Sequence, residues 1–210
     1  MPLDKKLVEN LIDITSKAAI SCYPYLGKKN KIIADKAATD VMRSNLNNLS
    51  INGEVVIGEG ELDEAPMLYI GEKLGNNKGQ MIDIAVDPVE GTNFVANNLP
   101  GAISVLTISE KGNLFKAPET YMNKIAFGQN IPKDVIDLDF TVEKNIKNLS
   151  DFKNKKIKDI SVCLLSRDRH KKIIETLIRL GVKIKLITDG DVTGALLVSC
   201  AAPTETSNVC

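Results

Sequence analysis

The 210-residue chain contains no tryptophan, and aromatic residues make up only 4% of it. Lysine and arginine together number 27, as do aspartate and glutamate, so the formal net charge is zero. Such a chain lacks both the basic surface and the stacking side chains that nucleic-acid binding requires. We therefore expect no nucleic acid among its partners.

Histidine and cysteine are also scarce. The chain has one histidine, His170, and four cysteines that form no C-x-x-C pair. A zinc site built from these residue types is excluded, and widely spaced thiols are typical of a reducing compartment. The sequence shows no apolar core of a signal peptide and no run long enough to span a bilayer. We expect a cytoplasmic protein without a membrane partner.

Hydrophobic periodicity predicts helices and then strands in the first 150 residues. Apolar residues recur at helical spacing over 3–26 and 31–49, with Gly27 as the C-cap of the first helix. β-rich runs predict strands over 54–57, 81–86 and 103–109, the last forming a hairpin with 114–116.

The rest of the chain alternates between strands and helices. Strands are predicted over 160–165 and 182–187, a helix capped by Asp168 and ended by Gly181 lies between them, and another helix ends near 200. This pattern predicts an α/β fold. A lysine-rich stretch suggests two domains, 1–150 and 151–210. The second has too few elements to cover a sheet, so apolar residues between 160 and 200 should be partly uncovered.

Acidic residues cluster at the ends of elements and in glycine-rich turns: Asp35, Glu59, Glu61, Asp63, Glu64, Asp87 and Glu90. Carboxylates that converge without lysine or arginine need a cation to neutralise them. Ligation by carboxylates alone suits Mg²⁺ or Mn²⁺, which bind phosphate oxygens and activate water. Solvated acidic turns explain the composition about equally well.

The hexapeptide D-P-V-E-G-T at 87–92 is more specific. Pro88 should end the preceding strand, and Gly91 permits a tight turn. Asp87 and Glu90 can then face one cation, with the hydroxyl of Thr92 directed at a bound water. The segment resembles the D-P-[ILV]-[DE]-G-[ST] signature of the metal-dependent, lithium-sensitive sugar and inositol phosphatases.

A second segment, Val56–Glu72, extends this likeness. Together the two segments resemble the class II, bacterial-type fructose-1,6-bisphosphatases, and the resemblance runs from the first helix to Asp191. It includes the stretches 117–122, 166–170 and 189–192. The stretch 91–98 is most similar to the cyanobacterial and plastid branch, whose members often also accept sedoheptulose-1,7-bisphosphate.

The resemblance implies a layered α-β-α-β-α sugar-phosphatase fold, a small-molecule sugar bisphosphate as substrate and Mn²⁺ or Mg²⁺ as cofactor. It implies a homo-oligomer for a full-length member. The implied metal ligands are Asp35, Glu59, Asp87 and Glu90. The implied catalytic residues are Lys31, Glu61, Asp63 and Thr92. The implied substrate contacts are Glu90, Gly91, Thr92, Tyr121, Arg167, Arg169, Asp189 and Asp191.

These assignments fit the chemistry of metal-assisted hydrolysis of the 1-phosphate. Arg167 and Arg169 are suited to bind the phosphate that does not react, although solvation at a helix start is the alternative role. Thr92, oriented by Asp63 or Asp35, would help to position and deprotonate the attacking water.

Family members continue well beyond the D-G-D-V segment, through a glycine-rich segment with a further acidic ligand. We therefore expect the fold to be incomplete at its C-terminus. Two alternatives to a sugar bisphosphatase stay open. One is an inositol or nucleotide phosphatase of the same superfamily, and the other is an inactive remnant that binds metal without turnover.

Overall fold

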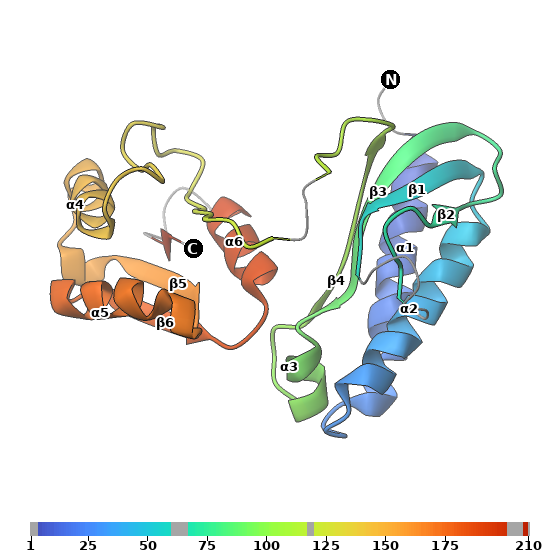
Figure 1. The fold of residues 1–210 in the computed structure, drawn as a ribbon, viewed down its shortest axis with the longest axis horizontal. Helices are drawn as coiled ribbons and strands as arrows, with labels where there is room; N and C mark the ends of the chain where they lie inside the picture. The colour runs from blue at the N-terminus through green and yellow to red at the C-terminus, as the bar shows by residue number, and fades with distance from the viewer. Residues whose placement is uncertain (1–3, 60–66, 117–119, 201–207, 210) are drawn as a thin grey trace. The chain divides into compact units, whose positions relative to one another are not determined.

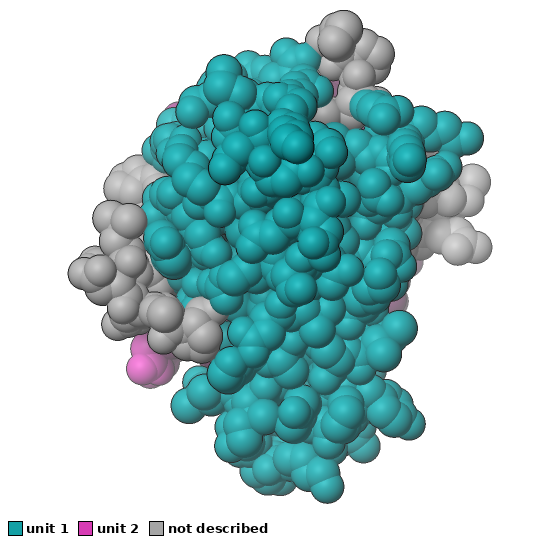
Figure 2. Space-filling model, turned by 90° about the vertical axis from the view of Figure 1, so that its right-hand side faces the viewer, with its two compact units in different colours: residues 1–120 teal, residues 121–210 magenta. Residues whose placement is uncertain are grey.

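A computed structural model of the chain describes residues 4–59, 67–116, 120–200 and 208–209. The chain divides into two compact units, 1–120 and 121–210, and each is described by itself (Figure 2). The boundary near residue 150 drawn from the sequence falls inside helix α4 (Val142–Lys153), which belongs to the second unit. The assignment of 1–150 to metal binding and 151–210 to substrate binding stays a prediction.

Two helices begin the first unit, as the periodicity predicts. They are α1 (Lys5–Ser21) and α2 (Lys31–Asn47), capped by Asp4 and Asn30, whose side chains accept hydrogen bonds from backbone N–H groups of the first turn. The two helices lie side by side against one face of a sheet (Figure 1). Gly27 is not the C-cap of α1, because the helix ends at Ser21 and Cys22 takes the C-cap position. Instead Gly27 follows the short helix η1 (Tyr23–Tyr25).

The sheet of the first unit has the order β2-β1-β3-β4. Its strands are β1 (Ile51–Ile57), β2 (Lys73–Leu74), β3 (Gln80–Glu90) and β4 (Ile103–Glu110). β1 and β3 are parallel, and the other pairs are antiparallel. The predicted hairpin with 114–116 is wrong, because β4 pairs with β3 and the described residues 111–116 contain no strand.

The core of the first unit lies between the two helices and the sheet. Ala18, Ala34 and Ala38 are fully buried, and these small side chains permit close packing of α1 and α2. Large side chains such as Met42 of α2 and Ile84 of β3 fill the space between the helices and the sheet. Full burial of each such side chain stabilises the fold by roughly 1.5–3 kcal/mol. The core therefore holds α2, β1 and β3 in a fixed mutual arrangement.

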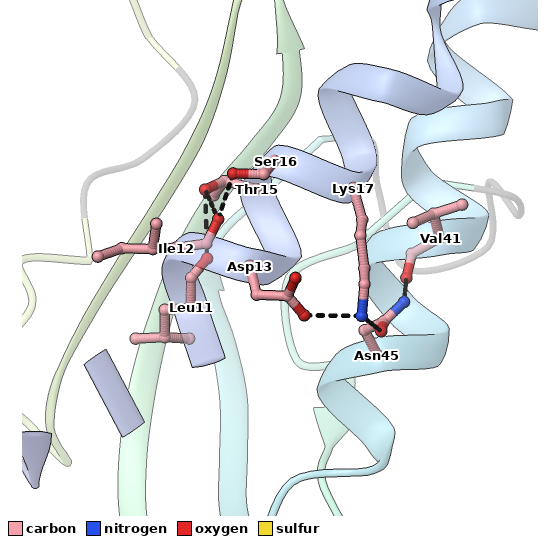
Figure 3. A network of polar contacts seen from close by, with 8 residues as sticks. All are labelled: Leu11, Ile12, Asp13, Thr15, Ser16, Lys17, Val41 and Asn45. Carbon is pink, nitrogen blue, oxygen red and sulfur yellow. Dashed lines mark hydrogen bonds and ion pairs between the residues drawn. The ribbon is translucent and has the colours of Figure 1, made fainter. Parts of the chain in front are cut away.

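Polar contacts tie the exposed sides of α1 and α2 together (Figure 3). The Lys17 ammonium lies 2.6 Å from Asp13 and donates to the side-chain oxygen of Asn45 on α2 at 3.4 Å. The hydroxyls of Thr15 and Ser16 donate to backbone carbonyls of the preceding turn. These contacts are solvent-exposed, so they contribute little to stability compared with the core.

The second unit contains a parallel sheet of order β6-β5-β7. Its elements after α4 are η2 (Ile157–Asp159), β5 (Ser161–Leu165), η3 (Asp168–His170), α5 (Lys171–Leu180), β6 (Lys183–Ile187), α6 (Asp191–Cys200) and β7 (Asn208–Val209). The predicted β-α-β-α order is confirmed. Asp168 is not the N-cap of α5, because η3 intervenes and His170 takes that position. Gly181 does end α5, with a left-handed φ of 73°.

The predicted exposure of apolar residues in the second unit is correct only in part. Leu186 is 47% exposed and Leu196 49%, whereas Ile160 and Val182 are buried. Residues between 125 and 149, including those of α4, pack against the same cluster and cover it. This cover comes from residues before 150, outside the β-α-β-α segment for which the exposure is predicted.

The α/β fold class is confirmed, and the five-layer order and its C-terminal incompleteness stay expectations from the resemblance. Among the described residues, none of the helices has the length and apolar character needed to cross a bilayer.

Candidate active site

The first half of α2 carries the first predicted site residues. The side chain of Asn30 accepts a hydrogen bond from Ile33 N–H, so the helix begins at the exposed Lys31. Asp35 lies about one turn later and is 7% exposed. This burial raises the pKa of Asp35 above its usual range.

Glu59 follows β1 and is held by its backbone. Its N–H donates to the carbonyl of Leu68 at 3.0 Å. The preceding residue must be glycine, because a Cβ on Gly58 would lie 2.2 Å from the carbonyl oxygen of Leu68. The glycine before Glu59 therefore has a steric cause, because the backbone that follows β1 lies directly against the backbone of Leu68.

Asp87 and Glu90 lie on β3 itself. Pro88 does not end this strand, which continues to Glu90 through a register shift against β4. The Asp87 carboxylate accepts a hydrogen bond from Val89 N–H at 3.0 Å across this irregularity. A bulge redirects side chains that would otherwise alternate between faces, so both carboxylates can serve one site.

Gly91 and Thr92 begin the helix α3 (Thr92–Asn97). Gly91 has a φ of 92°, and a Cβ there would lie 2.9 Å from the ring of Phe94, so glycine is required. Thr92 is the first helical residue. The segment before α2 is fastened to this helix, since Gly27 N–H donates to the Val95 carbonyl at 2.9 Å.

The pKa values of Glu59 and Asp87 reflect the charges of carboxyl groups on the other segments. Burial and then the charge of Asp35 raise the pKa of Glu59 to about 7, opposed by a hydrogen bond with Asp87. Burial and the charge of Glu59 raise the pKa of Asp87 to about 6, opposed by hydrogen bonds with Glu90 and Val89 N–H. The charges of Asp35, Glu59, Asp87 and Glu90, which come from α2, the end of β1 and β3, thus act on one another in partly buried surroundings.

The chemistry of this donor set fits a divalent cation. Asp35 Oδ1 and Glu59 Oε2 are buried and have no hydrogen-bond partner among the described residues. Hard carboxylate oxygens are the donors that Mg²⁺ and Mn²⁺ prefer. Within the described part of the chain, however, no three acidic, histidine or cysteine side chains already form a coordination sphere. Binding therefore requires these carboxylates to turn toward the cation. The predicted catalytic residues Glu61 and Asp63 lie outside the described residues.

In the second unit the structure brings Tyr121 and Arg169 together. The guanidinium of Arg169 lies 4.2 Å from the centroid of the Tyr121 ring, a cation–π distance, although Tyr121 is 84% exposed. Arg167 donates to the carbonyls of Ser166 at 3.2 Å and Thr188 at 2.7 Å. Its guanidinium therefore links the loops that follow β5 and β6.

Asp189 and Asp191 follow β6 at the same edge of the sheet as these arginines. Asp189 accepts a hydrogen bond from Gly190 N–H at 3.2 Å, and Asp191 is the first residue of α6. Ligands of open α/β sheets bind at the carboxyl ends of the parallel strands. The two acids and two arginines share that location.

One polar pair at the first unit's site was missed by the sequence analysis. Arg43 on α2 forms an ion pair with Glu72, which is 8% exposed. The signal was the helical row of Asp35, Thr39 and Arg43, spaced four residues apart on a face that is otherwise apolar.

Comparison with known proteins places this chain in a family. A sequence model described as "Bacterial fructose-1,6-bisphosphatase, glpX-encoded" matches residues 5–209. The chain belongs to this family. The resemblance drawn from the two motifs is therefore confirmed.

Curated relatives carry corresponding names. "Fructose-1,6-bisphosphatase class 2" of Haemophilus influenzae is 41% identical over 201 residues, which cover 96% of this chain and 60% of the relative. "D-fructose 1,6-bisphosphatase class 2/sedoheptulose 1,7-bisphosphatase" of Synechocystis is 42% identical over 211 residues, covering 95% of this chain and 60% of that protein. The chain thus spans about 60% of the length of these relatives. Among solved structures, an extragenic suppressor from Pyrococcus furiosus overlaps 51% of this chain and 41% of its own, with a TM-score of 0.35 and 20% identity. That overlap is too small to support a conclusion.

Proposed function

We propose that the protein hydrolyses the 1-phosphate of fructose-1,6-bisphosphate with the help of divalent cations. The observation that carries this proposal is that the charges of Asp35, Glu59, Asp87 and Glu90 act on one another, while Asp35 Oδ1 and Glu59 Oε2 are buried without a hydrogen-bond partner among the described residues. Mutual repulsion among buried carboxylates is costly unless a cation or protons neutralise them. Membership of the class II fructose-1,6-bisphosphatase family supports the choice of substrate.

Mg²⁺ or Mn²⁺ held by these four side chains would polarise the phosphate and lower the pKa of a bound water. Thr92, at the start of α3, would position the attacking water through its hydroxyl. A carboxylate, Asp63 or Asp35, would orient Thr92 so that its hydroxyl takes part in deprotonating that water. Lys31, about one turn before Asp35, would place its ammonium near the phosphate charge.

Residues of the second unit would recognise the rest of the substrate. Arg167 and Arg169 carry the positive charge suited to the phosphate that is not hydrolysed. Asp189 and Asp191 can accept hydrogen bonds from sugar hydroxyls, and Tyr121 adds a hydroxyl and an apolar face. In the first unit, Glu90 and Gly91 would contact the reacting end.

Sedoheptulose-1,7-bisphosphate is a second candidate substrate. The Synechocystis relative is named for both activities, and its identity to this chain is 42%, against 41% for the Haemophilus influenzae relative named for fructose-1,6-bisphosphate alone. The two percentages do not separate the substrates, so we propose both. A homo-oligomeric, cytoplasmic enzyme is part of the same proposal.

The experiment is phosphate release from a panel of substrates, measured with Mn²⁺, with Mg²⁺ and with a chelator. The panel holds the two sugar bisphosphates, an inositol monophosphate and a nucleotide monophosphate. We expect release from the bisphosphates, abolished by the chelator and by Asp87→Asn. Preferential hydrolysis of the inositol or nucleotide phosphate would instead identify the alternative phosphatase. Cation binding without turnover of any compound would identify an inactive remnant.

A further inference from the structure

Arg43 binds two residues of the segment 67–72, Met67 and Glu72, and we call this set of contacts the clamp. Its Nε donates to Glu72 Oε1 at 2.6 Å and its Nη2 donates to Glu72 Oε2 at 3.1 Å. The same Nη2 donates to the carbonyl of Met67 at 2.5 Å. A bidentate pair of this kind is short, strong and directional, and the hydrogen bond with Glu72 raises the pKa of Arg43.

The clamped segment is also fastened to β1. Val55 N–H donates to the Glu72 carbonyl at 2.9 Å, and Gly71 N–H donates to the Val55 carbonyl at 2.7 Å. Leu68, the residue after Met67, is fully buried, and its carbonyl accepts the hydrogen bond from Glu59 N–H. Arg43 therefore reaches the backbone of Glu59 through Met67 and Leu68.

The other end of this connection is Asp35. Arg43 lies on the same helix, about two turns after Asp35, and both side chains share the helix face that packs on the first unit's core. Arg43 thus adds a directional polar contact, beside the core packing, between the helix that carries Asp35 and the segment that binds the Glu59 backbone. The Arg43 side chain joins α2 to the carbonyl of Met67, the residue before the Leu68 whose carbonyl binds Glu59 N–H.

We propose that Arg43 is a positioning residue, which sets the distance between the Asp35 and Glu59 carboxyl groups through its contacts with Met67 and Glu72. This inference rests on the proposed metal function of those carboxylates. Residues that orient metal ligands typically change metal affinity 10–100-fold when they are replaced. A purely structural ion pair would instead change the stability of the fold and leave the affinity of the folded protein unaltered.

The test is calorimetric titration of Mn²⁺ into the parent protein and a double variant, Arg43→Gln with Glu72→Gln. Replacing both partners avoids leaving one buried charge unpaired. The matched control is Arg179→Gln with Glu143→Gln, which removes the exposed Arg–Glu pair of the second unit, also 2.6 Å long. We expect about 10–100-fold weaker Mn²⁺ binding in the Arg43 variant and no change in the control.

A double-mutant cycle with Glu59→Gln separates positioning from a general effect. If Arg43 acts through Glu59, its replacement causes no further loss of Mn²⁺ affinity in the Glu59→Gln background. An equal loss in both backgrounds overturns the inference. Circular dichroism at the titration temperature establishes that each variant is folded. If the double variant unfolds, Arg43→Lys takes its place, because it keeps the charge and loses the planar fork.

The outcomes distinguish this inference from the proposed function. A parent protein that binds no Mn²⁺ overturns the metal function and the inference together. A parent that binds Mn²⁺ with the same affinity as the folded Arg43 variant overturns only the positioning role.

Discussion

The carboxyl groups of Glu59 and Asp87 act on each other: a hydrogen bond with Asp87 lowers the pKa of Glu59, and the charge of Glu59 raises the pKa of Asp87. Both pKa values lie above their usual ranges, at about 7 for Glu59 and about 6 for Asp87. At pH values below about 7 the metal-free protein therefore keeps a proton on Glu59, where a cation would otherwise balance the charge. Protons and cations should compete for this site.

The first prediction concerns stability against pH. An acid whose pKa is raised by folding stabilises the protein at pH values below its unfolded pKa, here about 4. That stabilisation is lost as the pH rises through the folded values of about 6 for Asp87 and about 7 for Glu59. The free energy of unfolding of the metal-free chain should fall across this range, and Mn²⁺ should raise Tm more at about pH 7.5 than at about pH 5. Equal Mn²⁺-induced shifts at the two pH values would contradict the competition.

The second prediction compares two aspartates of α2. Asp35→Asn removes a buried carboxylate of the site and should weaken Mn²⁺ binding at least about tenfold. Because it also removes a repelling charge, it should not destabilise the metal-free protein. Asp40→Asn is the control, since Asp40 is exposed and pairs with Lys36 at 2.5 Å. Calorimetric titration measures both affinities, and equal affinities for the two variants would remove Asp35 from the site.

Thr92 offers a test of the chemical step. Thr92→Val keeps the shape of the side chain but removes the hydroxyl that would position the attacking water. We expect kcat for fructose-1,6-bisphosphate to fall about 100-fold, with KM little changed. The exposed Thr107 on β4 provides the control, Thr107→Val. An unaltered kcat in the Thr92 variant would show that the hydroxyl takes no part in the reaction.

The basic residues of the second unit should affect substrate binding. Arg169→Ala removes a charge-assisted contact worth roughly 1.5–3 kcal/mol and should raise KM for a bisphosphate about 10–150-fold. Tyr121→Leu should have a smaller effect, since it removes the ring beneath the guanidinium but not the charge. If the Arg169 variant has the parent's KM, Arg169 is only a solvated residue at a helix start.

Substitution of Gly58 tests the steric requirement for glycine before Glu59, and Gly128 provides the control. Gly58→Ala would place a Cβ 2.2 Å from the Leu68 carbonyl oxygen, so the backbone at Glu59 must shift. We expect a loss of about 1–3 kcal/mol in the free energy of unfolding together with weaker Mn²⁺ binding. At Gly128 the nearest atom would be 3.9 Å away, so Gly128→Ala should be within about 0.5 kcal/mol of the parent. Denaturant unfolding measures both, and equal stability of the two variants would contradict this account.

The sequence could predict what depends on neighbouring residues. Helical spacing located α1 and α2, and the D-P-V-E-G-T segment was identified because its six residues are contiguous. The partner of β4 could not be read in this way, because a hairpin with 114–116 and pairing with β3 present the same local pattern. For the same reason the pattern did not show that β3 continues past Pro88 through a bulge.

The Arg43–Glu72 clamp shows the same limit within the site. Each residue alone is an ordinary charged side chain, and the long stretch of chain between them hides the pairing. The row of Asp35, Thr39 and Arg43 on a buried helix face did signal that polar groups must find partners there. Only the fold identifies Glu72 and the Met67 carbonyl as partners of Arg43.

The most direct test of the metal site is anomalous diffraction from crystals of the protein soaked in Mn²⁺. The account predicts an anomalous peak among the carboxylates of Asp35, Glu59, Asp87 and Glu90, with metal–oxygen distances of about 2.0–2.6 Å. That peak should be lost in crystals of the Asp87→Asn variant. A fully soaked crystal with no peak among these four side chains, or with its peak elsewhere, would contradict the account.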